Sequence, residues 1–446
     1  MTRKPISARL LPLALAVGGL MGSSAASALT LLQAYEAALQ NDPAYRAAYY
    51  QAEAGKENRI LGRSALLPSV SGAYSGSQNR STLNYNGGKD VAQDYISRSA
   101  TIQVRQPLFS MDAWARYKQG AAQSEYAAAQ FDSQAQEVLM RVLGNYFEVL
   151  LKEDQLAYAK AERDMYVEQR NVNDLLYKRG EGTRTDLLET QSRLELAEAQ
   201  LLETQDALNN AREALNATVG ASVELGALDH LRPGLSVERA DIKGFETWRA
   251  LALANNPDIR TQQKNIEIAK QEINKQRAGH APRVDLVGTY GKTSSDTLST
   301  IDQDTTVRSI GFQVNIPFYS GGAVSASTRQ AVANREKALA DLQGQTDKVL
   351  LDLRKNYNQI VSSQPKFDAL ERAVASAKLL ITATEQSIKG GVRINLDLLT
   401  AQRQLFGAQR DLAQARYGYL LAVLRLRADA GTLTPEDVRM VAAYFE

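Results

Sequence analysis

Large apolar side chains recur at every seventh position near the end of the chain, and an alanine follows three places behind most of them. A large residue and an alanine in one heptad phase make a narrow seam along a helix, and the small residue lets a second helix backbone come close. The pattern therefore predicts a long helix that packs sideways against other helices. Its members are Leu398, Leu405, Leu412, Tyr419 and Leu426, with Ala401, Ala408, Ala415 and Ala422.

The same seam occurs in the first half of the chain. Its members there are Leu187, Leu194, Leu201, Leu208 and Leu215, trailed by Thr190, Ala197, Thr204, Ala211 and Thr218. Asn41-Asp42-Pro43 is likewise matched by Asn255-Asn256-Pro257, where Asn or Asp can cap a helix and proline fits its first turn. We predict an internal duplication with repeats over 29–220 and 244–431, an irregular connector over 221–243 and a short tail over 432–446.

The first 28 residues are typical of an export signal. Arg3 and Lys4 precede an apolar run from Leu10 to Leu20, and the small residues of 26–28 form a cleavage site. The alternative is an uncleaved anchor, but the run is shorter than the roughly 20 apolar residues of a spanning helix. The segment predicts that the mature protein leaves the cytoplasm.

Composition excludes several classes of function. The 52 Lys and Arg nearly balance the 50 Asp and Glu, and there is no dense basic run, so we expect no nucleic-acid partner. The absence of cysteine removes thiol nucleophiles, thiolate metal sites, disulfides and a lipid-modified cysteine. Any attachment to a membrane must therefore come from the fold.

Four segments alternate with period two, as strands do. Val70, Gly72 and Tyr74 alternate with serines, and the segment 284–290 is their counterpart in the second repeat. A polar loop over 79–94 leads to a second strand, whose counterpart in the second repeat spans 309–316. We expect these strands to end at Pro107 and Pro317, each followed by a step that contains an aromatic residue (Leu108-Phe109 and Phe318-Tyr319), as in an interfacial girdle.

Two helical patterns, over 113–176 and 323–388, would each be roughly 100 Å long. After each of these helices the chain reverses at a glycine turn and continues as one of the heptad helices. The heptad helices end at Gly220 and Gly431. In lipid only a closed barrel satisfies all strand backbone groups, and about eight strands is the smallest closure. Four strands cannot close a barrel alone, so several copies of the chain must share one. The alternative is a soluble sheet with one solvent-exposed face.

These residues also carry a resemblance. The run Gly391 to Leu399, with 415–420 and Gly431-Thr432-Leu433, resembles the C-terminal half of the TolC family of outer-membrane ducts, and the similarity spans essentially the whole mature chain. The resemblance implies a mainly α fold with a membrane β-barrel. It also implies a homotrimer in which the four strands of each protomer form a shared twelve-stranded barrel in outer-membrane lipid. A long α-helical coiled-coil tunnel would continue this barrel across the periplasm.

The resemblance also implies partners. The first half is most similar to ducts of type I secretion systems, which export proteases, lipases or adhesins with an inner-membrane ABC transporter and a periplasmic adaptor. Efflux of small molecules through the same architecture stays open. A rival from another class is a secreted coiled-coil adaptor or structural protein, but an adaptor needs one helical hairpin and no apolar-faced strands.

The glycine turns are the first candidate sites. On geometry alone Gly180 and Gly391 are helix-ending residues in the left-handed conformation, and Thr185 or Asn395 is an N-cap. The resemblance adds that the turns form the periplasmic tip where the adaptor docks. The tip glycines are Gly180, Gly182, Gly390 and Gly391, of which Gly182 departs from the family pattern.

Asp186 and Asp397 follow the turns, where a carboxylate is stabilised by the helix dipole. In a trimer they would also form a ring of six carboxylates at the channel constriction, a field that admits cations. The resemblance further implies a gate latch between Arg393 and Asp186. Arg184 is a nearer rival for Asp186, and the family's gate tyrosine is replaced by Ile388.

No residues suggest catalysis or a cofactor. His230 and His280 are the only histidines and lack metal-ligand spacing. The chain has no phosphate-binding glycine loop and no Ser/His/Asp arrangement that spacing singles out. We therefore expect no enzymatic activity, no metal and no cofactor.

Overall fold

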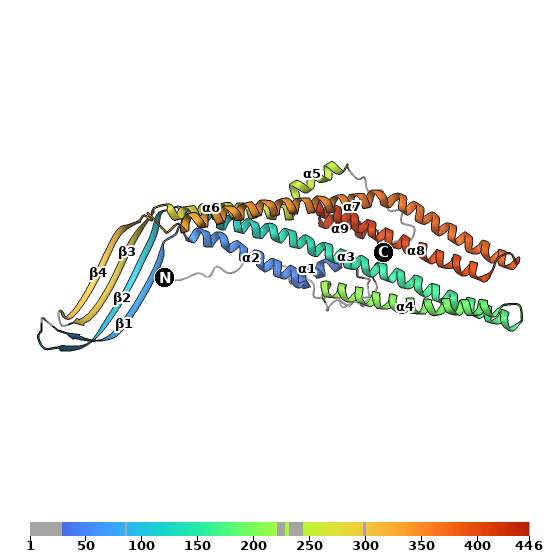
Figure 1. The fold of residues 1–446 in the computed structure, drawn as a ribbon, viewed down its shortest axis with the longest axis horizontal. Helices are drawn as coiled ribbons and strands as arrows, with labels where there is room; N and C mark the ends of the chain where they lie inside the picture. The colour runs from blue at the N-terminus through green and yellow to red at the C-terminus, as the bar shows by residue number, and fades with distance from the viewer. Residues whose placement is uncertain (1–28, 85–86, 221–227, 232–243, 298–299, 446) are drawn as a thin grey trace, which may run out of the picture.

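The computed structural model describes residues 29–84, 87–220, 228–231, 244–297 and 300–445. The predicted export signal and most of the predicted connector lie outside the described residues. Figure 1 shows a long molecule with a β-sheet at one end and the turns of two helical hairpins at the other. Among the helices that the structure describes, none is both long enough and apolar enough to cross a lipid bilayer.

Each repeat has the same order of two short helices, two strands, a long helix and a returning helix. The first consists of α1 (Leu31–Asn41), α2 (Pro43–Ser64), β1 (Ser69–Leu83), β2 (Val91–Ser110), α3 (Met111–Lys178) and α4 (Arg184–Val219). The second consists of α5 (Phe245–Asn255), α6 (Pro257–Arg277), the short 3-10 turn η1 (Ala278–His280), β3 (Arg283–Thr297), β4 (Thr300–Asn315), α7 (Ala323–Lys389) and α8 (Asn395–Asp429). The predicted duplication is therefore present in the fold.

Matching caps start the second helix of each repeat. Asp42 Oδ1 accepts from the backbone N–H of Ala44 at 2.7 Å, and Asn256 Oδ1 accepts from that of Asp258 at 3.0 Å. Each cap satisfies N–H groups that have no partner within the helix. The Asn/Asp-Pro motif therefore divides α1 from α2 and α5 from α6, as predicted.

The four strands form one antiparallel sheet in the order β1-β2-β3-β4. Val70, Val104, Gly288 and Ile310 face one another across the sheet, and their face is apolar and exposed. The opposite face is polar: the Arg105 guanidinium donates to the Gln313 side chain at 2.9 Å across the sheet. The alternation predicted from the sequence is therefore real.

The strand limits differ from the prediction. The polar segment 79–94 is mostly strand, because Arg80 and Asp94 are cross-strand partners joined by an ion pair at 2.8 Å. Polar side chains on both strands continue the hydrogen-bonded ladder beyond the apolar part. Pro107 does not end β2, which continues to Ser110 after a register shift between Pro107 and Phe109. Proline lacks an N–H, and a bulge accommodates the missing ladder bond.

The main apolar core lies half-way along the helices, where α3, α8 and α1 meet. Leu143 and Leu150 of α3 and Leu424 of α8 are fully buried there. The predicted tail forms α9 (Pro435–Ala442), and the Phe445 ring after it stacks on Phe147 with centroids 5.7 Å apart. The end of the chain is therefore part of the core.

Asp429, the last residue of α8, lies inside this region. Its carboxylate accepts from the Asn356 side chain at 2.7 Å, and its carbonyl accepts from the Asn256 side chain at 2.9 Å. Burial raises the pKa of Asp429 to about 6, although the Asn356 hydrogen bond opposes the shift, and the carboxylate of Asp352 adds to it. Folding therefore favours the protonated form of this carboxyl group.

We expect Asp429→Asn to stabilise the protein at pH 8 by about 1 to 2 kcal/mol. Folding raises the pKa of Asp429 above its unfolded value. The contribution of this carboxyl group to the stability of the folded state is therefore fully present below about pH 4 and is lost as the pH rises through about 6. The replacing amide is neutral at both pH values and keeps an acceptor for Asn356. Unfolding followed by circular dichroism at pH 4 and pH 8 checks this, and an equal stability difference at both would contradict it.

Candidate functional site at the hairpin tips

The two hairpin turns are built alike. Gly180 has φ 75° and Gly391 has φ 73°, so both lie in the left-handed region predicted for them. The N–H of Gly180 donates to the Tyr177 carbonyl at 3.0 Å, and that of Gly391 donates to the Ile388 carbonyl at 2.9 Å. These bonds end α3 and α7 and turn the chain back.

The other two tip glycines differ in what they require. A Cβ on Gly182 would lie 3.0 Å from Leu176 Cβ and 3.1 Å from the backbone nitrogen of Tyr177, so the first turn folds tightly over the end of α3. A Cβ on Gly390 would meet nothing nearer than the Ser387 carbonyl at 3.6 Å, and its φ is −84°. Of these two glycines, only Gly182 lies where an added side chain would be crowded.

The two carboxylates occupy the first turn of α4 and α8, as predicted. Asp186 Oδ2 accepts from the Thr183 hydroxyl at 2.6 Å, and the Thr183 Oγ1 accepts from the Asp186 N–H at 3.1 Å. Asp397 Oδ2 accepts from the Ile394 N–H at 3.4 Å. Each carboxylate therefore satisfies a free N–H at the start of its helix.

The predicted N-caps are wrong. Thr183 caps α4 and Ile394 occupies the N-cap position of α8, whereas Thr185 and Asn395 lie inside the helices. The backbone of Thr183 is extended, with ψ 154°, which lets its hydroxyl reach the amide three residues on. The helices begin earlier than the pattern of polar residues indicates.

A cavity of about 510 Å³ lies between the two tips. Glu181 and Asp186 reach it from the first hairpin, and Lys389 and Arg393 reach it from the second, whereas Asp397 is not part of its lining. Among the described residues, Asp186 and Arg393 form no ion pair within 4.0 Å, and neither does Arg184. The structure thus brings the two latch residues to one cavity, with the Asp186 carboxylate bonded to Thr183.

A polar cluster that the sequence did not single out joins the hairpins beside this cavity. It consists of Gln169, Asn173, Thr190 and Asn395, and we call it the tip cluster. The Asn395 amide donates to the Thr190 hydroxyl at 3.2 Å, and the Asn173 amide donates to the same oxygen at 2.7 Å. Gln169 donates to the Asn395 side-chain oxygen at 2.9 Å. The tip cluster therefore links α8 to both α3 and α4.

Thr190 is the centre of the tip cluster and is fully buried. Its heptad position is the one that Ala401 occupies in the second repeat. The sequence could have indicated the tip cluster through this threonine, which stands where the seam pattern leads one to expect alanine. A buried hydroxyl needs a hydrogen-bond partner. Only the position of Asn395 on the other hairpin shows what that partner is.

An apolar cluster of Tyr166, Leu194, Ala197 and Leu399 packs behind the tip cluster and again joins both hairpins. Burial raises the pKa of Glu162, which lies at the same level of α3, and the guanidinium groups of Arg410 and Arg403 on α8 oppose this shift. The hairpins are therefore held together by polar contacts in the tip cluster and by apolar contacts behind it.

The sequence and the fold match known proteins. A sequence model described as "Outer membrane efflux protein" matches residues 34–221 and 248–432. The chain belongs to the outer membrane efflux protein family. The predicted family resemblance is thereby confirmed, and the protein is located in the outer membrane and extends into the periplasm.

Relatives within this family cover nearly the whole chain. It is 40% identical to the alkaline protease secretion protein AprF of Pseudomonas aeruginosa, over 94% of this chain and 88% of that protein. It is 36% identical to the proteases secretion protein PrtF of Dickeya chrysanthemi, over 96% and 93%. Its fold is similar to that of the CmeC outer membrane channel of Campylobacter jejuni, with a TM-score of 0.80 and 16% identity over 93% and 90% of the two chains.

Proposed function

We propose that this protein is the outer-membrane duct of a type I protein-secretion system, acting with a periplasmic adaptor and an inner-membrane ABC transporter. The observation that carries the proposal is the similarity over almost the whole chain to two proteins named for protease secretion. The exported substrate would be a protein of the protease, lipase or adhesin type. Efflux of small molecules is the second candidate, favoured by the description of the family.

A closed duct requires more than one copy. In the sheet, β1 and β4 each have one neighbour, so two strand edges are free in a single chain. Unpaired backbone groups are costly in lipid, and edge-to-edge pairing of three copies would close a twelve-stranded barrel. We therefore expect a homotrimer in detergent, measured by mass photometry; a stable, folded monomer would contradict this.

The hairpin tips supply the adaptor-docking surface in this proposal. They lie at the end of the molecule farthest from the sheet, as Figure 1 shows. In the trimer, Asp186 and Asp397 would supply the six carboxylates of the constriction, and Arg393 would latch the gate through Asp186. The cavity shared by Asp186 and Arg393 supports the proposed pairing of these two residues.

Complementation separates the two candidate functions. The gene is expressed in one strain that lacks the outer-membrane component for protease secretion and in another that lacks its drug-efflux duct. We expect extracellular protease activity to return in the first strain and drug resistance to stay low in the second. Restored resistance without protease export would favour efflux instead.

A further inference from the structure

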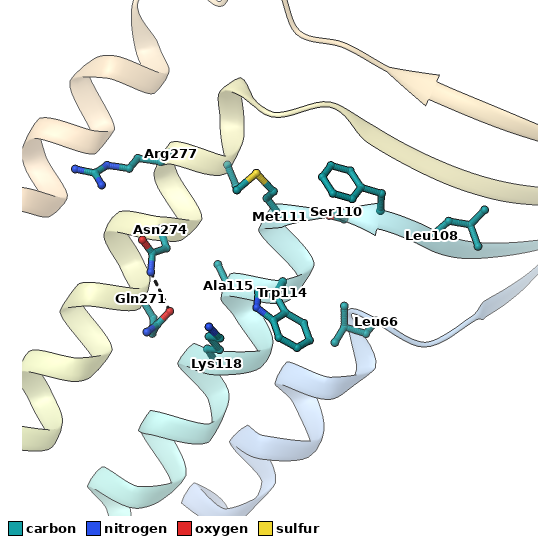
Figure 2. Close-up of a pocket in the computed structure, with 12 residues that line it drawn as sticks. Leu66, Leu108, Ser110, Met111, Trp114, Ala115, Lys118, Gln271, Asn274 and Arg277 are labelled. Carbon is teal, nitrogen blue, oxygen red and sulfur yellow. Dashed lines mark hydrogen bonds between the residues drawn. The ribbon is translucent and has the colours of Figure 1, made fainter.

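A second cavity, of about 650 Å³, lies where the sheet meets the helices. Figure 2 shows side chains from the turn after α2, the end of β2, the start of α3 and the end of α6 around it, with the Arg277 side chain directed away from Trp114 at the edge. Its lining includes Leu108, Phe109, Met111 and Trp114, and each of these apolar residues is about half exposed. Such large apolar side chains gathered on one surface mark a binding site.

The cavity opens on the apolar face of the sheet. Phe109 is the cross-strand partner of Val284, which in turn faces Val314 of β4. Partners across a sheet place their side chains on the same face, and this face also carries Val104 and Ile310. In an outer-membrane protein the exposed apolar face contacts lipid, so the cavity is continuous with the lipid-facing surface.

The charged side chains of the cavity are all cationic. Lys118 and Arg277 line it, and no carboxylate does. Lys118 Nζ lies 5.5 Å from the centroid of the Trp114 ring. Within the described part of the chain, neither Lys118 nor Arg277 forms an ion pair within 4.0 Å. The cavity therefore combines an apolar wall with two cations that no described carboxylate approaches within 4.0 Å.

We propose that this cavity binds an anionic phospholipid, with a hydrocarbon chain against Leu108, Phe109 and Trp114, the phosphate near Lys118, and Arg277 at the edge of the cavity as the second cation. Basic residues beside a bilayer attract anionic lipid, and an indole is suited to the interface. In the proposed trimer a second copy would not cover the site, because β2 and β3 are central in the sheet and only β1 and β4 have free edges for pairing between copies. This binding role goes beyond export.

Trp114 reports on the site directly. The chain has 2 tryptophans, and Trp248→Phe removes the one in α5, which lies beside α7 away from the sheet. The purified variant is reconstituted into phosphatidylcholine vesicles that contain either phosphatidylglycerol or phosphatidylcholine with brominated acyl chains, at equal mole fractions. Bromine quenches indole fluorescence on contact, so the mole fraction for half-quenching measures occupancy.

We expect brominated phosphatidylglycerol to reach half-quenching at a roughly fivefold lower mole fraction than brominated phosphatidylcholine. In the Lys118→Gln, Arg277→Gln double variant this ratio should fall to about one. Arg372→Gln is the matched control, since it removes an exposed cation of α7 near the tips and should leave the ratio unchanged.

Three results would overturn the proposal. If neither brominated lipid quenches Trp114, the cavity does not contact lipid. Equal quenching by both lipids would show that no anionic headgroup is recognised. A preference that survives the double variant would place its origin outside this cavity. Circular dichroism spectra matching the parent's show that a variant is folded, and none of these outcomes depends on export activity.

Discussion

Arg393→Ser and Asp186→Asn should each raise single-channel conductance in planar bilayers, and the double variant should add little. An arginine can bind a carboxylate with two hydrogen bonds. At a solvent-exposed channel entrance, such an ion pair contributes about 0.2 to 1 kcal/mol of stabilising free energy. Three copies would sum to roughly 1 to 3 kcal/mol, which shifts a gate equilibrium by about one or two decades. Binding of an adaptor could supply that free energy.

The structure supplies a control for this latch. Arg184 lies on the same tip as Asp186 but does not line the cavity that Asp186 shares with Arg393. Arg184→Ser removes the same charge at the same end of the molecule, so its conductance should match that of the parent. If Arg184→Ser raised conductance as much as Arg393→Ser, a general change of charge would be responsible.

The tip cluster offers a different explanation that the same recording can detect. Thr190→Val keeps the side-chain shape and removes the hydroxyl that Asn173 and Asn395 share. If Thr190→Val opens the channel while both charge variants conduct like the parent, the tip cluster is the latch. Effects of Arg393→Ser and Asp186→Asn that simply add would also show that the two residues do not act as a pair.

Gly391→Leu should reduce export at least tenfold while leaving the trimer intact. A leucine at φ 73° is strained by about 1 to 2 kcal/mol, and it adds bulk to an exposed tip where the adaptor would dock. The strain stays local, because the turn lies far from the sheet and the main core. Export is measured as secreted protease activity, and assembly is measured by mass photometry.

Two substitutions separate strain from bulk. Gly391→Asn should retain most of the export, because asparagine tolerates the left-handed conformation. Gly390→Leu adds the same bulk one residue earlier at φ −84°, where a side chain meets only ordinary contacts. Export lost in both leucine variants would indicate blocked docking. Parallel loss of export and trimer in Gly391→Leu would instead show that the turn is only structural.

Local signals predicted most of the helical limits. The Asn/Asp-Pro pairs marked the starts of α2 and α6, and Gly180 and Gly391 marked the tips, since each residue type satisfies a backbone requirement within one turn. The strands were less predictable. Their outer parts are mostly polar, so no regular hydrophobic alternation reveals them, and the pairing of Arg80 with Asp94 depends on register.

The sequence by itself determined the duplication, the long hairpins, the alternating strand faces and the family, because these depend on periodicity and on spacing along the chain. Only the tertiary structure decided what lies at the tips and at the rim of the sheet. Asn395 and Thr190 are 205 positions apart, and the cavity beside Trp114 is completed by α6 from the other repeat. Such contacts depend on how two hairpins align when their apolar seams pack, and no local pattern encodes that alignment.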